Sequence, residues 1–90
     1  MSLFKEGTVE VRGTAYRVRE LSWKERKEFL RLVKEDAISC GAYLAYVCTV
    51  EPKFKSLVEV EDLPPEFADK ISAKVMEVSG MGKEEDAKKD

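Results

Sequence analysis

An uncharged run from Ala37 to Val50 is the feature that most constrains how this chain can fold. The run has 14 residues and is rich in Ala and Tyr. A helix that crosses a bilayer needs about 20 apolar residues, so the run is too short for a membrane span. A helix that lacks a polar face must be covered on most sides. The run therefore predicts a buried helix, at the centre of a bundle or against a partner.

Length and composition indicate one small domain. The chain has 90 residues, of which 43% are apolar and 38% are charged, and this size leaves room for one core. We expect a mainly α fold over residues 1–81, a small helical bundle of three main helices with an N-terminal β-hairpin. Residues 82–90 contain one apolar side chain, Ala87, and are expected to form a disordered charged tail.

The hairpin is predicted from alternating residues near the N-terminus. Apolar side chains alternate with polar ones on both sides of a turn, at Val9, Val11, Tyr16 and Val18. A two-residue type II′ turn at Gly13-Thr14 would pair Val11 with Tyr16. It would also place Glu10 opposite Arg17 on the other face. Because two strands alone are marginal in water, the apolar face must pack on the helices that follow.

The first helix is expected to begin after Ser22, because Ser22 and Glu25 have the spacing of a capping box. Apolar residues then recur at helical spacing among charged ones, at Trp23, Leu30, Val33 and Ala37. We expect this stripe to face the core. Asp36 can cap the uncharged helix that follows, and Glu51-Pro52 should end it.

A short helical turn is expected next, because Ser56 and Glu59 repeat the capping-box spacing. A strand is the alternative for this segment, because Val58 and Val60 alternate. The third main helix begins after two prolines and ends at a glycine, with its apolar stripe at Phe67, Ile71, Val75 and Val78 between Pro64-Pro65 and Gly80.

Charge and residue types exclude several classes of function. Lys and Arg total 16 against 18 Asp and Glu, a net charge of −2, so the basic surface typical of nucleic-acid binders is absent overall. The chain has no His, the commonest general base and metal ligand, and no nucleotide-binding or calcium-loop motif. We therefore expect no enzyme activity, cofactor, metal, nucleic acid or membrane contact.

The two cysteines indicate the cellular compartment of the protein, and the absence of side-chain amides indicates its source. Cys40 and Cys48 would lie ~12 Å apart along one helix, too far to bridge, and unpaired cysteines without a signal peptide favour a reducing cytoplasm. The chain also lacks Asn and Gln while Lys, Arg and Glu are abundant. This bias is typical of a thermophile.

The order of these parts resembles the small tail assembly chaperones of long-tailed phages and prophage-like elements. The resemblance covers roughly residues 7–81. It rests on a strand pair leading into Tyr16 to Ser22, then Lys24 to Arg26 and Glu28-Phe29, an uncharged helix ending in Glu51-Pro52, Val60 to Pro64 before the last helix, and Val75 to Met81 at its end.

The resemblance implies a chaperone without catalytic residues. Such a protein binds the phage tape measure protein, keeps its helical apolar surfaces from aggregating, and helps the tail tube protein to gather around it. It acts in the host cell cytoplasm and is absent from the finished virion. Many such families also make a longer form by ribosomal frameshifting near the end of this reading frame.

A chaperone surface must accept a client in several registers, which suits aromatic side chains with polar tips and adaptable thioethers. The candidate partner-binding residues are Tyr43, Tyr46, Phe54, Met76 and Met81. Each of them could equally belong to the core. A homo-oligomer is also consistent with the sequence, because the uncharged helix needs more cover than two helices and a hairpin give.

Four other functions remain open. The chain could be a small oligomeric virion structural or connector protein, or a small regulatory protein-interaction domain. Nucleic-acid binding would use the basic residues of the first helix, Lys24, Arg26, Lys27, Arg31 and Lys34. An enzyme would have to use Cys40 or Cys48 as its nucleophile.

Overall fold

The computed structural model describes residues 3–81 of the chain. Over this range the elements are β1 (Glu6–Val11), β2 (Thr14–Arg19), α1 (Trp23–Glu35), α2 (Ala37–Cys48), β3 (Thr49–Glu51), α3 (Leu57–Glu61) and α4 (Pro65–Val78). Helices dominate, as expected, but the strands form an antiparallel sheet in the order β1-β2-β3. The fold is therefore α+β rather than a three-helix bundle. The predicted tail, residues 82–90, lies outside the described residues.

The hairpin has the predicted faces but a different register. Val9 pairs with Tyr16 and Val11 with Thr14, so the turn consists of Arg12 and Gly13. Both turn residues have positive φ, 51° and 87°, as in a type I′ turn. The predicted turn lay one residue too late and shifted the pairing by two, which preserves the faces because strand side chains alternate.

The expected pairing of Glu10 with Arg17 is therefore wrong. Arg17 lies opposite Thr8, and its guanidinium instead approaches carboxylates of Glu6 at 3.8 Å and Glu51 at 3.4 Å. Glu51 belongs to β3, the strand that the sequence did not reveal. β3 follows directly on α2 and pairs with β2, with Val18 opposite Thr49. The uncharged helix thus ends at Cys48, before Glu51-Pro52.

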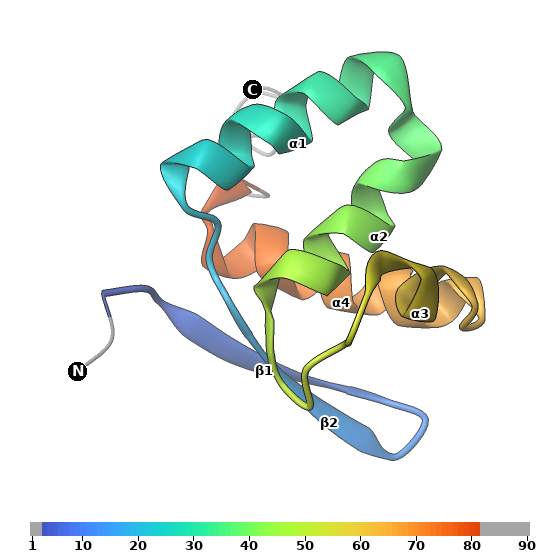
Figure 1. Cartoon of the computed structure of the whole chain (residues 1–90). Coiled ribbons are helices and arrows are strands. Elements are labelled where there is room, and N and C mark those ends of the chain that lie inside the picture. The colour runs from blue at the N-terminus through green and yellow to red at the C-terminus, as the bar shows by residue number, and fades with distance from the viewer. Residues whose placement is uncertain (1–2, 82–90) are drawn as a thin grey trace, which may run out of the picture.

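The core lies between the sheet, α2 and α4. Figure 1 shows the hairpin on one side of α2 and α4, with α1 at the opposite end of the molecule. The buried side chains come from both strands of the hairpin and from all four helices, with Val11, Val18, Leu44, Ile71 and Val75 fully covered. The predicted stripe of α4 is thus confirmed at Ile71 and Val75.

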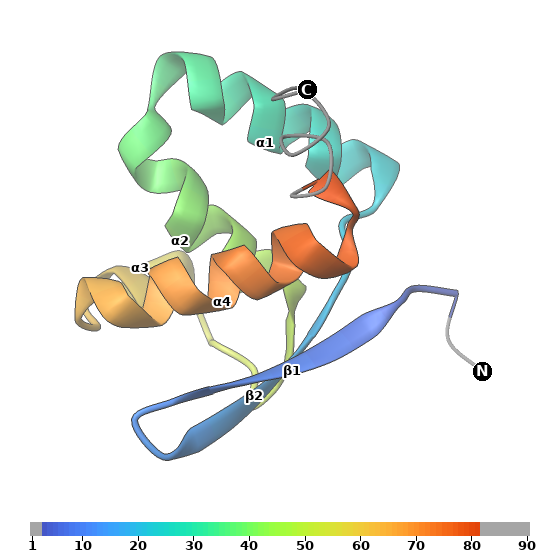
Figure 2. The same cartoon turned by 180° about the vertical axis from the view of Figure 1, so that it is seen from behind.

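Close packing of α4 on the sheet depends on Gly7 in β1. A Cβ atom at this position would lie 2.8 Å from Cγ1 of Val78 and 3.0 Å from Cε of Lys74. Such contacts are too short for a real side chain, so glycine lets α4 lie directly on β1. Figure 2 shows the molecule from behind, with α4 between the hairpin and α1.

The short segment before α4 is helical, which decides between the two alternatives. Ser56 caps α3 through its hydroxyl, which accepts a hydrogen bond from the backbone N–H of Glu59 at 3.3 Å. Val60 is buried, whereas Val58 is 60% exposed. Gly80 follows α4 with φ of 80°, as a glycine just after a helix often does.

Candidate partner-binding surface

Helix α1 exposes the apolar residues that were expected to face the core. Trp23 is 76% exposed, Leu30 49% and Val33 45%. The buried residue of this helix is Phe29, and α1 packs mainly against α2. We call Trp23, Leu30 and Val33 the α1 ridge. The expectation that this stripe faces the core is wrong, because apolar spacing reveals an apolar face but not what covers it.

The three ridge residues share one face of the helix. Leu30 is seven residues, or about two turns, after Trp23, and Val33 is three residues after Leu30. Single exposed apolar residues are common on soluble proteins. A group of large ones on one face is instead typical of a protein contact.

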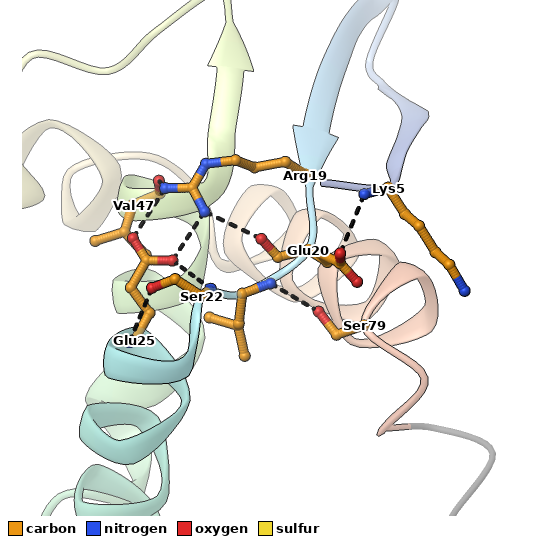
Figure 3. A network of polar contacts seen from close by, with 8 residues as sticks. Lys5, Arg19, Glu20, Ser22, Glu25, Val47 and Ser79 are labelled. Carbon is orange, nitrogen blue, oxygen red and sulfur yellow. Dashed lines mark hydrogen bonds and ion pairs between the residues drawn. The ribbon is translucent and has the colours of Figure 1, made fainter. Parts of the chain in front are cut away.

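A polar junction fixes the orientation of α1 relative to β2 and α2 (Figure 3). Arg19, at the end of β2, donates two hydrogen bonds of 2.8 Å to the two carboxylate oxygens of Glu25. Its guanidinium also donates to the backbone carbonyl oxygens of Val47 at 2.8 Å and Glu20 at 3.0 Å. One side chain thus ties the start of α1 to the end of α2.

The same carboxylate completes the predicted capping box. Oε1 of Glu25 accepts a hydrogen bond from the backbone N–H of Ser22 at 3.0 Å, and the Ser22 hydroxyl accepts one from the N–H of Glu25 at 3.2 Å. The neighbouring N–H of Leu21 donates to the Ser79 hydroxyl, just after α4, at 3.0 Å. The hydrogen bonds from Arg19 lower the pKa of Glu25 below its ordinary value.

A groove of about 680 Å³ lies between α1 and α2. Both helices line it, with Tyr43 and Val47 from α2 and the charged Lys24, Glu25, Lys27, Glu28 and Arg31 from α1. Burial raises the pKa of the Tyr43 hydroxyl. The groove therefore combines charged side chains of α1 with an aromatic side chain of α2.

A second groove, of about 450 Å³, lies between α2, α3 and α4. Most of its lining is apolar, including Ala42, Val60, Leu63 and Ala68, and Glu61 and Asp69 add two carboxylates. Ile38, 95% exposed, also lines this groove. The two carboxylates make the charge of this groove opposite to that of the basic residues on α1.

The structure separates the five predicted partner-binding residues into two groups. Phe54 lies in the core, 7% exposed, with its ring stacked 5.7 Å from that of Tyr16. Tyr43, Tyr46, Met76 and Met81 are half-buried and pack against the core. Of the five, Tyr43 lines the groove next to α1. The α1 ridge, which the sequence interpretation assigned to the core, exposes more apolar surface than any of them.

The described part of the chain also shows the environment of Cys48 and the distribution of metal-binding side chains. Burial raises the pKa of the Cys48 thiol to about 12, so its thiolate is scarce near neutral pH. Residues 3–81 contain no cluster of three or more His, Cys, Asp or Glu side chains that could hold a metal ion. None of the helices in this range is both long and apolar enough to cross a membrane.

Comparison of the chain with protein-family models, curated proteins and solved structures gave no match. The exposed α1 ridge is therefore the feature of this chain that bears most directly on function.

Proposed function

We propose that this protein is a non-enzymatic tail assembly chaperone that binds the tape measure protein of a long-tailed phage or prophage-like element in the host cytoplasm. The observation that carries the proposal is the exposed α1 ridge of Trp23, Leu30 and Val33. The order of elements that resembles this family supports it, and the Arg19–Glu25 junction lies within the segment of resemblance.

The physical task of such a chaperone fits a ridge on a rigidly held helix. A long helical client exposes an apolar stripe that would aggregate before tail tube subunits cover it. An apolar ridge on another helix can cover that stripe by side-chain packing between the two helices. The Arg19–Glu25 pair holds α1 in place, so little conformational entropy is lost when the ridge binds a client.

The test is co-expression with the largest coiled-coil-like protein encoded just downstream in the genome. The wild-type chain should copurify with this client and increase its soluble fraction. The double variant Trp23→Ser/Leu30→Ser should lose both effects, because it replaces the two most exposed apolar side chains of the ridge. Val58→Ser in α3, at a side chain 60% exposed, is the control and should behave as wild type.

Failure of the wild-type chain to bind or solubilise this client would reject the chaperone function. Equal binding by the wild type and the Trp23/Leu30 double variant would reject the ridge as the contact. In that case the half-buried Tyr43 and Met76 would be the next positions to replace.

A small oligomeric virion component is the second candidate, and the groove between α2, α3 and α4 favours it. The apolar lining and the carboxylates of Glu61 and Asp69 are complementary to an apolar ridge with basic neighbours. A ridge of one copy in the groove of the next would be a head-to-tail contact that forms rings or filaments. The virion component would have to form a stable oligomer, which light scattering of the purified chain measures. It would also have to be present in finished particles, whereas a chaperone would be absent from them.

A further inference from the structure

We infer that the α1 ridge binds an amphipathic helix whose apolar stripe is flanked by acidic residues. This inference rests on the proposed function, because it assigns that helix to the tape measure protein. It specifies the chemistry of the segment that the chaperone recognises, which the resemblance does not give.

The first observation is that basic residues surround the ridge. Arg26 is three residues after Trp23 and four before Leu30, while Lys27 is four after Trp23 and Lys34 four after Leu30. Residues three or four apart lie on the same helix face. The face that presents Trp23 and Leu30 therefore also presents three cations.

The second observation is that the acids of α1 lie elsewhere and are already paired. Glu25 binds Arg19 at the junction with β2 and α2. Glu28 pairs with Arg31, and Glu35 accepts from Arg31 at 2.6 Å. The acids of this helix are therefore held by arginines away from the ridge, and the charge beside the ridge is positive.

The third observation concerns the two lysines. Lys27 and Lys34 are both exposed, and neither forms an ion pair with another residue of the described range 3–81. Two exposed cations next to an apolar ridge attract acidic groups and repel basic ones. The partner that fits has leucine-like residues for the ridge and carboxylates for Lys27 and Lys34.

A protein helix fits this surface better than other partners. Nucleic acid has phosphates for the lysines but no apolar stripe for Leu30 and Val33. A helix that lies in a membrane needs a continuous apolar face, whereas lysines interrupt this one. Two copies of the ridge facing each other would bring the cations Arg26, Lys27 and Lys34 of both copies together, and these like charges repel. An acidic amphipathic helix offers an apolar stripe to the ridge and carboxylates to the lysines beside it.

The experiment uses two synthetic helical peptides with identical leucine stripes, one flanked by Glu and the other by Lys. Trp23 is the single tryptophan of the chain and lies on the ridge, so its fluorescence reports binding at the ridge itself. The Glu peptide should shift the emission of Trp23 to shorter wavelength, with an affinity that falls as salt rises. The Lys peptide should bind at least about tenfold more weakly.

Charge reversal tests the role of the two lysines. Lys27→Glu/Lys34→Glu should reverse the preference, so that the Lys peptide binds about tenfold more tightly than the Glu peptide. Both side chains are exposed, so the fold should be unaffected. Lys53→Glu/Lys55→Glu changes net charge equally at two exposed positions outside α1, and it should keep the wild-type preference.

Several results would overturn the inference. These are an unchanged preference in the Lys27/Lys34 variant, equal binding of both peptides, or a Trp23 shift produced by anionic vesicles or duplex DNA but not by the Glu peptide. Self-association of the chain that the same variant abolishes would also overturn it, because the occupant would then be a second copy.

The same variants separate this inference from the proposed function. If the downstream client binds the wild type and the Lys27/Lys34 variant equally, the inference fails while the chaperone function stands. If the Glu peptide binds at Trp23 but the client does not, the chaperone function fails while the preference of the ridge for acidic helices stands.

Discussion

At the scale of single residues, the paired side chains of Arg19 and Glu25 connect β2, α1 and α2. Their side chains are 24% and 20% exposed and meet through two parallel hydrogen bonds. A paired arrangement of this kind is stronger than a single surface ion pair, because geometry and partial burial both favour it. The pair therefore contributes to stability as well as to the position of α1.

We predict that Glu25→Gln lowers the free energy of unfolding by about 1–2 kcal/mol near neutral pH, since charged hydrogen bonds are lost. The pKa of Glu25 is lower in the folded than in the unfolded chain, so its stabilisation is present above about pH 4.3 and is lost as pH falls through the folded pKa. The difference between wild type and variant should therefore shrink in acid. Urea unfolding at a series of pH values measures it.

Glu28→Gln is the control for this prediction. Glu28 also has a lowered pKa, caused by Arg31, but its side chain lies at the surface, where water screens the pair. Its replacement should change stability less than that of Glu25. A pH-independent difference between wild type and Glu25→Gln would contradict the electrostatic origin.

At the scale of elements, capping and turn signals gave the helices but not the details of the sheet. Ser22 with Glu25, Ser56 with Glu59, and the proline and glycine around α4 predict helices because each satisfies free backbone groups or sets φ locally. The turn residues were misplaced because Arg12 takes a positive φ, which is uncommon for an arginine. β3 was missed because three residues beside a long apolar run give no periodic signal.

The turn assignment leads to the next prediction. Gly13 has φ of 87°, a conformation that costs a residue with a Cβ atom about 1–2 kcal/mol. Gly13→Ala should therefore destabilise the protein by about that amount, as measured by urea unfolding. No side chain crowds this position, so the loss is conformational and not steric.

Thr14→Ala provides the comparison, because Thr14 starts β2 after the turn and is exposed. Its replacement should cost less than that of Gly13. If the turn lay at Gly13-Thr14 instead, NMR contacts would pair Val11 with Tyr16. Because Val9 pairs with Tyr16 in the structure, NMR contacts should instead join these two residues.

The α1 ridge shows the limit of prediction at this scale. The spacing of Trp23, Leu30 and Val33 correctly indicated an amphipathic helix. It could not indicate that α1 packs mainly on α2, because the packing depends on how α2, α4 and the sheet fill the core between them. The candidate site was therefore visible in the sequence as a pattern but was assigned to the wrong environment.

At the scale of the whole molecule, the fold divides its apolar residues between a closed core and an open ridge. Ile71 and Leu44 are fully buried between helices and sheet, whereas Leu30 is half exposed. In a domain of this size one core supplies the stability. Replacement of an exposed residue of the α1 ridge should therefore affect binding more than folding.

We predict opposite results for Ile71→Ala and Leu30→Ser. Ile71→Ala leaves a cavity and should lower the free energy of unfolding by about 2–4 kcal/mol, whereas Leu30→Ser should change it by less than about 1 kcal/mol. At temperatures where both variants remain folded, Leu30→Ser should bind the client more weakly than Ile71→Ala does. Urea unfolding and client pulldown on the same samples measure both quantities. If Leu30→Ser destabilised the chain as strongly as Ile71→Ala, the ridge would be covered within the free protein, and α1 would belong to the core rather than to a binding surface.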